Sequence, residues 1–321
     1  MTTIETISGY VFTPGDLKVA GRKPGLSAFL RTRNGADFIE ATIRSHIGFY
    51  DEIVAVYNQC TDATPDILAR LAQEFTPKLR LFHYTDRVQP LGSRGHADTP
   101  GDHPESMVNY SNFALSRTLF RDVVKLDDDH LAIPTEVAAI TKDFRESRAD
   151  TGVLHCFSGL NIARSKDGRL GIPAFDPVSG GGDIGYFRMT PETCFFHDRR
   201  FERFGRGNLK RRFAGYFYWH LKFLKAGDGF GNYELDANPA SRFARKRDRF
   251  ANTRLLELPG AMRDLRPGAS ERLAALASDK LRLKTARDGA AAGMFPDATL
   301  EDALDRLSPG WREVLGLGVA R

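Results

Sequence analysis

Three carboxylates and an imidazole follow an apolar run in the sequence VVKLDDDH (123–130). The apolar run predicts a strand, so the acidic group opens at the carboxyl end of that strand. Residues i and i+2 of an extended chain point the same way, and Asp127 and Asp129 can therefore face one ion while Asp128 faces elsewhere. Carboxylate oxygens are the ligands that Mg²⁺ and Mn²⁺ prefer, in shells that substrate phosphates complete. We predict a Mn²⁺ or Mg²⁺ site with Asp127 and Asp129 as ligands; the alternative is an acidic loop of turn-forming aspartates.

The elements around the acidic group alternate between strand and helix. Strands are predicted at 26–31, 52–57, 79–83 and 123–126, and helices at 37–47, 64–75, 106–118 and 134–144. This alternation predicts an α/β fold with a Rossmann-like, mostly parallel sheet and helices on both faces. Ligands of such sheets bind beyond the carboxyl ends of the strands, where the acidic group lies. The polar residues 85–104 form a lid or a surface insertion.

The sequence pattern changes after residue 145. Strands are predicted at 152–160, 170–172 and 184–189, which indicates a mixed region, and helices at 215–225, 270–284 and 300–307. We divide the chain into an N-terminal extension (1–24), the two halves of one domain (25–145 and 146–258) and a C-terminal helical extension (259–321).

Charge and composition limit the classes of protein. The chain has 321 residues, a net charge of +5 and a pI near 9.1, which favours anionic partners such as nucleotide diphosphates, anionic lipid surfaces or nucleic acid. Arginine-rich stretches at 199–212 and 242–254 carry much of this charge, either as binding surfaces or as solvated faces. No membrane-spanning run and no leader signal occur, so we expect a cytoplasmic protein with reduced cysteines, whose membrane contact is at most peripheral and with anionic lipid.

Two more polar segments follow predicted strands, LSAFLRTRN (26–34) and YNQCTDAT (57–64), and Asn112 lies fifteen positions before Asp127 on a predicted helix. In this order the motifs resemble those of the inverting family-two nucleotide-sugar glycosyltransferases, which have a GT-A type fold and a DxD metal motif. The resemblance covers less than half of the chain. It implies that the first half of the domain binds a nucleotide-sugar donor and that the second half binds a glycan or lipid-linked acceptor; polysaccharide biosynthesis is a common role of the family.

The resemblance also implies a set of donor-binding side chains: Arg31, Thr32, Asn34, Asn58, Asp62, Asn112, Asp127 and Asp128. Those that follow the first strand would contact base, ribose or phosphate, and those that follow the second would hydrogen-bond the base or ribose. Asp127 would reach the ribose or the metal, while Asp129 would bind the metal. The cation would stabilise the negative charge that develops on the leaving diphosphate.

An inverting enzyme also needs a base for the acceptor hydroxyl, and here the sequence departs from the family. The family's acidic pair on a helix is absent, and GYFYWHLKFLKAG (215–227) stands in its place. His220 in that segment is a base, a further metal ligand or a hydrogen-bonded helix residue. Asp183 follows three glycines and is the other candidate base, because glycines allow a substrate to approach the backbone closely; the alternative is a flexible turn that ends in Asp183.

The sequence leaves three alternative functions. A sugar nucleotidyltransferase would need a glycine-rich loop after the first strand, where residues 30–38 offer only Gly35. A non-catalytic sugar- or nucleotide-binding relative would keep the pocket without turnover. A nucleic-acid-binding protein fits the charge but not the acidic strand end, so we expect no nucleic acid partner.

Overall fold

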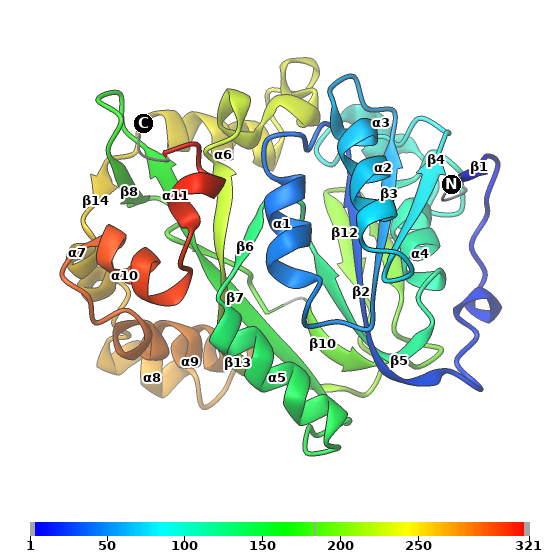
Figure 1. Cartoon of the computed structure of the whole chain (residues 1–321). Helices are drawn as coiled ribbons and strands as arrows, with labels where there is room; N and C mark the ends of the chain where they lie inside the picture. The colour runs from blue at the N-terminus through cyan, green and yellow to red at the C-terminus, as the bar shows by residue number, and fades with distance from the viewer. Residues whose placement is uncertain (1–3, 183, 318–321) are drawn as a thin grey trace.

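The computed structural model describes residues 4–182 and 184–317, and one large sheet organises them (Figure 1). Its main path runs in the order β1 (Glu5–Ile7), β4 (Leu79–Tyr84), β3 (Glu52–Asn58), β2 (Lys23–Thr32), β5 (Phe120–Leu126), β10 (Gly185–Arg188), β7 (Val153–Arg164), β13 (Lys210–Phe223) and β6 (His130–Ala132). Three short strands lie off this path: β8 (Leu170–Pro173), β9 (Val178–Ser179) and β14 (Leu255–Leu256). A separate hairpin pairs β11 (Phe195–Asp198) with β12 (Phe201–Phe204).

The first five strands of this path are parallel, and the sheet becomes mixed beyond them. β10 is antiparallel to both β5 and β7, β13 is parallel to β7, and β6 is antiparallel to β13. The predicted α/β fold with a mostly parallel first half is confirmed. All residues of β3 are buried because the sheet continues on both sides of this strand and helices cover both of its faces.

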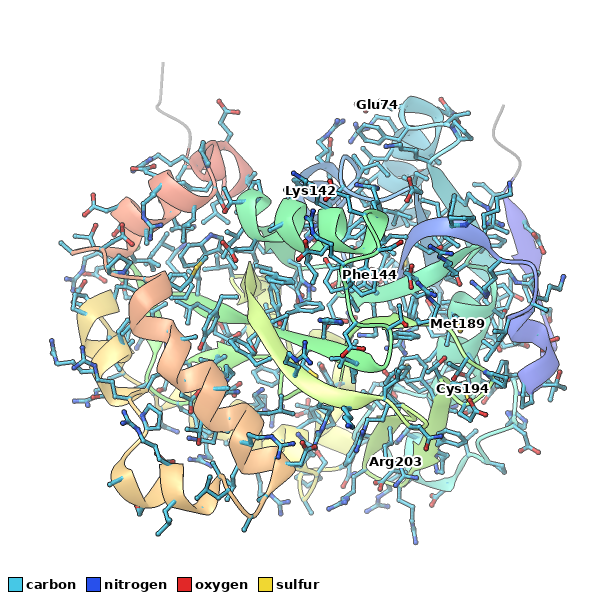
Figure 2. All side chains as sticks on the ribbon, turned by 90° about the horizontal axis from the view of Figure 1, so that it is seen from below. Glu74, Lys142, Phe144, Met189, Cys194 and Arg203 are labelled. Atoms are coloured by element: carbon cyan, nitrogen blue, oxygen red, sulfur yellow. The ribbon has the colours of Figure 1, made fainter. Side chains whose placement is uncertain are left out.

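Alternate residues of the central strands pack into two different cores. On one face, β2 and β3 residues such as Ala28 and Ile53 pack with α1 (Ile39–His46), α2 (Thr64–Glu74) and α5 (Pro134–Arg145). On the other face, residues such as Phe29 and Val54 pack with α4 (Met107–Ser116). The helices predicted in this half are therefore confirmed on both faces. On α5, Phe144 is buried while the neighbouring Lys142 lies in solvent, as Figure 2 shows.

The prediction of a helix at 215–225 is wrong, because these residues belong to strand β13. β13 lies inside the sheet between β7 and β6, and residues 216–221 are all buried. A strand buried on both faces has no polar side, so its apolar run lacks the alternation that marks a half-exposed strand. The aromatic residues of this run indicate its secondary structure better than the periodicity does, because large aromatics favour strands.

The C-terminal residues form helices that pack against the mixed part of the sheet. They are α7 (Leu258–Asp264), α8 (Ala269–Ala274), α9 (Asp279–Met294), α10 (Leu300–Leu307) and α11 (Trp311–Val314). The predicted single helix at 270–284 is in fact two, because Ser278 starts a new helix by accepting a hydrogen bond from the amide of Leu281. Figure 1 shows these helices gathered beside β7, β13 and β6, far from α2. Among the described residues, none of the helices combines the length and the apolar character that crossing a bilayer requires.

Candidate active site

A pocket of about 660 Å³ opens beyond the carboxyl ends of β2, β3 and β5. This is the edge of a parallel sheet at which ligands bind. The predicted residues that line it are Arg31, Thr32, Asn34, Asn58, Asp62, Asp127, Asp128, Asp129 and His220. Asn112 does not line it, and Asp183 lies outside the described residues. Most of the residues singled out in the sequence are therefore brought together at one place.

Two lysines partly neutralise the three aspartates that follow β5. Lys125 Nζ pairs with Asp127, whose side chain is 49% exposed. Lys225 Nζ lies 2.6 Å from Asp128 Oδ1 and 2.8 Å from Asp129 Oδ2. Burial alone would raise the pKa of Asp129, but Lys225 holds that pKa well below its ordinary value. Lys225 could not be identified from the sequence, because it lies about a hundred positions from its acidic partners.

Asp129 forms a compact group with two histidines. Asp129, His130 and His220 each offer a ligand atom, and these atoms all lie within 4.8 Å of one another. Asp129 Oδ1 and both ring nitrogens of His130 are buried, with no hydrogen-bond partner among the described residues. Burial lowers the pKa of His130 to about 3, so the ring is neutral and keeps a free lone pair.

The orientation of His220 is fixed by Asn161. Asn161 Nδ2 donates to the carbonyl of Asp176, which leaves Asn161 Oδ1 to accept from His220 Nδ1 at 2.5 Å. The other ring nitrogen, Nε2, then faces Asp129 Oδ1 at 3.3 Å. Outer hydrogen bonds of this kind orient histidine ligands in metal sites.

The described donors of this group fit a divalent ion. A buried carboxylate oxygen and imidazole nitrogens without partners are costly unless an ion or water satisfies them. A mixed nitrogen and oxygen set favours a transition metal such as Mn²⁺ over Mg²⁺. Asp129 belongs to this group, whereas Asp127 faces Lys125 and lies 3.7 Å from His130. The role of Asp127 as a metal ligand stays a prediction.

The strand register explains why His130, His220 and Asn161 lie side by side. His220 of β13 lies opposite His130 of β6 and beside Asn161 of β7, so one row across three strands carries all three polar side chains. Tyr218 stacks on His130 with ring centroids 3.6 Å apart and covers one face of it. A helix at 215–225 could not produce this row.

Three residues of the predicted donor-binding set have polar atoms engaged in building the pocket wall. Asn58 donates to the carbonyls of Tyr84 and Asp86 at 2.7 and 2.6 Å. Asp62 accepts from the amides of Ala36 and Thr64, each at 3.0 Å. Asn34 likewise accepts from the amide of Thr61 at 2.7 Å and donates to Asn232 Oδ1 at 3.1 Å. These side chains hold together the loops after β2 and β3.

Asn112 has a structural position instead. Its amide group donates to the carbonyl of Phe195 at 2.9 Å and accepts from the amide of the same residue at 2.7 Å. It therefore fastens β11 to α4, and the donor-binding role is not supported by its location. Strand β12, which pairs with β11, carries Glu202. Glu202 lines the pocket and was not indicated by the sequence.

Arg31 and Glu202 form a paired group at one side of the pocket. Arg31 donates to the two carboxylate oxygens of Glu202 at 2.6 and 3.0 Å and to Ser111 Oγ at 2.5 Å. Both side chains are about nine-tenths buried. The pair is 171 positions apart in the chain, so no local pattern could have revealed it.

Gly180, one of the glycines before Asp183, packs closely against the neighbouring strand β7. Gly180 has φ +87°, and a Cβ there would lie 2.6 Å from the carbonyl oxygen of Phe157 in β7. The glycine therefore permits a close approach to the neighbouring strand. The neighbouring Ser179 lines the pocket.

Comparisons with known proteins find only partial likeness. No protein-family model and no curated protein matches the chain. TarS from S. aureus, solved with UDP, is 18% identical over 45% of this chain and 37% of that chain, with a TM-score of 0.28. Glucosyl-3-phosphoglycerate synthase from Mycobacterium tuberculosis, solved with Mn²⁺, UDP and glucosyl-3-phosphoglycerate, is 20% identical over 51% of this chain and 53% of that chain, with a TM-score of 0.28.

The matched region spans about half of these proteins or less. A likeness this partial assigns neither activity nor substrate to the chain, and the site is described by its own geometry.

Proposed function

We propose that the chain is a metal-assisted glycosyltransferase that moves a sugar from a nucleotide-sugar donor to a hydroxyl of a glycan or lipid-linked acceptor. The observation that carries this proposal is the compact group of Asp129, His130 and His220 beside a pocket that also presents lysines. Among the described residues, Asp129 Oδ1 and both ring nitrogens of His130 have no hydrogen-bond partner. The pocket volume of about 660 Å³ lies in the range that suits small ligands and cofactors. A divalent ion held by this group would stabilise negative charge on a leaving diphosphate.

The lining residues divide the pocket into regions of different chemistry. Val88, Pro90 and Leu91 provide an apolar wall near Asn58, which suits the flat face of a base. Asp127 is the most exposed of the three aspartates and lines the same pocket as Ser179, so these two side chains can hydrogen-bond sugar hydroxyls. Asp183 remains our candidate for the base, and inversion is part of the proposal.

A sugar nucleotidyltransferase is less well supported. Gly35 is the sole glycine after β2 in residues 30–38. A Cβ at Gly35 would lie 2.5 Å from Asp128 Oδ2, so this glycine permits close packing of the loop on the acidic group. Its position does not resemble a loop that wraps a triphosphate. A non-catalytic relative would bind the same donors but would show no turnover.

The test is a panel of UDP-, GDP- and ADP-sugars, each with Mn²⁺, screened by thermal unfolding. A ligand at a hundred times its Kd raises the free energy of unfolding by about 2.7 kcal/mol, which a melting curve resolves. We expect one donor class to stabilise the wild type and to be hydrolysed or transferred. Asp129→Ala should lose the Mn²⁺-dependent stabilisation, whereas Asp167→Ala in an exposed turn should retain it. No stabilisation of the wild type by any donor would end the proposal.

A further inference from the structure

One lysine of the pocket is not neutralised by any carboxylate among the described residues. Arg31 pairs with Glu202, Lys125 with Asp127, and Lys225 with Asp128 and Asp129. Arg33 has a longer pairing with Glu234 at 3.7 Å. Lys222 lines the same pocket, and within the part of the chain that the structure describes it has no ion pair.

Two aromatic rings hold the Lys222 ammonium group in place. Nζ lies 4.8 Å from the ring centroid of Phe230 and 4.7 Å from that of Tyr233. Nζ also donates to the Tyr233 hydroxyl at 3.3 Å. Ring faces attract a cation without cancelling its charge. An ammonium group has three donors, so two remain after the bond to Tyr233.

The backbone around Lys222 is shaped to fit this side chain. Gly229 has φ +69°, and a Cβ at that position would lie 2.5 Å from both Lys222 Cγ and the Lys222 carbonyl oxygen. Any side chain there would displace Lys222 or the turn that covers it. The placement of Lys222 therefore depends on a glycine that lies seven positions away in the chain.

The segment that carries the two rings is fastened to the loop after β2, which also lines the pocket. It consists of the short helices η2 (Ala226–Gly229) and η3 (Gly231–Tyr233), with Phe230 between them. The amide of Ala226 donates to Asp37 Oδ2 at 3.0 Å, and Asn232 Nδ2 donates to the carbonyl of Arg33 at 2.5 Å. The loop after β2 therefore helps to position the two rings around Lys222.

We propose that Lys222 is a phosphate anchor of this pocket, which binds the diphosphate of the nucleotide donor. This inference rests on the proposed function and names the residue that would recognise the phosphates. A lysine binds phosphate as a point charge through its free N–H donors, which matches the two that Lys222 retains. His220 and Lys222 lie two positions apart on β13 and both line the pocket, so the anchor adjoins the Asp129 group.

The test compares nucleoside diphosphates with nucleosides. UDP, GDP and ADP, and uridine, guanosine and adenosine, are titrated by calorimetry in the presence of Mn²⁺ at fixed ionic strength. Lys222→Met removes the charge but keeps an unbranched stem, and it should weaken binding of the preferred diphosphate by about tenfold or more. Binding of the matching nucleoside should stay unchanged. Lys222→Arg should retain most of the affinity for the diphosphate.

Two further variants separate the anchor from a general effect on the fold. Lys210→Met alters an exposed lysine at the start of the same strand, outside the pocket, and should bind the diphosphate as the wild type does. Gly229→Ala should show the same selective loss as Lys222→Met, because it displaces the Lys222 side chain. Undiminished diphosphate binding by Lys222→Met overturns the assignment of Lys222 alone. A wild type that binds none of the three diphosphates overturns the proposed function and this inference with it.

Discussion

At the scale of single residues, Asn161 decides which nitrogen of His220 faces Asp129. Its Oδ1 can only accept a hydrogen bond, so the proton of a neutral His220 is held on Nδ1 and the lone pair on Nε2 points toward Asp129. Without Asn161, the ring could take the other tautomer or rotate. A residue two strands away from the acidic group therefore controls whether that group offers a lone pair or an N–H.

We predict that Asn161→Ala weakens Mn²⁺ binding by about 10- to 100-fold, the usual cost of losing an outer partner of a metal ligand. Titration of Mn²⁺ followed by electron paramagnetic resonance measures this directly. Asn161→Asp keeps an acceptor for His220 Nδ1 and should restore most of the affinity. Asn208→Ala, at an exposed position, is the matched control. Equal Mn²⁺ affinity in Asn161→Ala and the wild type would show that Asn161 does not orient the ring.

His46 makes the free energy of unfolding depend on pH. Burial lowers the pKa of His46 to about 4, and Nδ1 donates to the carbonyl of Thr42 at 2.8 Å. The unfolded chain, with an ordinary pKa near 6.5, takes up the proton first as the pH falls. The contribution of neutral His46 to the free energy of unfolding is therefore complete above pH 6.5. It is lost as the pH falls toward 4, by about 3 kcal/mol in total.

We predict that His46→Gln flattens the pH dependence of the unfolding free energy between pH 6.5 and 4 by about 3 kcal/mol relative to the wild type. Urea unfolding at a series of pH values measures it. His103→Gln changes an exposed histidine and should leave the slope as it is. A slope that is identical in His46→Gln and the wild type would contradict the prediction.

At the scale of elements, the strands of the parallel half could be predicted and β13 could not. The strands predicted at 26–31, 52–57, 79–83 and 123–126 were recognisable because each is a short apolar run between segments with a helical pattern. The run at 213–221 in β13 is long and almost entirely apolar, since it is covered on both faces and paired on both edges. Periodicity alone cannot distinguish such a strand from a buried helix.

The contact between β7 and β13 is close enough to require a glycine. A Cβ at Gly159 would lie 2.5 Å from both the ring and the carbonyl oxygen of Tyr218. We predict that Gly159→Ala lowers the free energy of unfolding by about 1–3 kcal/mol or more through overpacking. Gly289→Ala, at an exposed position inside α9, should instead raise it by about 1 kcal/mol because alanine favours helix. Chemical unfolding of both variants measures the difference, and a destabilised Gly289→Ala or a neutral Gly159→Ala would contradict this account.

At the scale of the whole molecule, the C-terminal helices share a core with the sheet. Residues of β6, β7 and β13 pack with those of α7, α9, α10 and α11 in one cluster. Trp219 Nε1 donates to Ser308 Oγ at 3.0 Å, and that hydroxyl donates to the carbonyl of Ala132 at 2.7 Å. The helices at 259–321 were predicted as an extension. Their packing shows that they complete the core under the strands that carry His130 and His220.

We predict that Leu304→Ala lowers the free energy of unfolding by about 2–5 kcal/mol, because Leu304 is fully buried in this shared core. The loss should appear as a shift of a single transition that is followed both by tryptophan fluorescence and by circular dichroism. Leu276→Ala, at a position 81% exposed, is the control and should have little effect. Two separate transitions would show that the C-terminal helices unfold on their own.

The sequence revealed the acidic end of the pocket but not Glu202, Lys222 or Lys225. Asp127 to Asp129 follow a strand directly, so their location is a local property of the chain. Glu202 pairs with Arg31 over 171 positions, and Lys225 pairs with Asp128 over 97. Such long-range register depends on the packing of the whole sheet and has no local signature.

The placement of β13 also bears on synthesis at the ribosome. The polar segments that follow β2, β3 and β5 have all been translated once residue 145 has emerged. β6, at 130–132, pairs in the described structure with β13, which is translated nearly eighty residues later. A nascent chain that displays the full acidic motif thus still lacks His220, Lys222 and Lys225. Under the proposed function, nucleotide binding would accordingly begin late, when β13 has been inserted between β7 and β6.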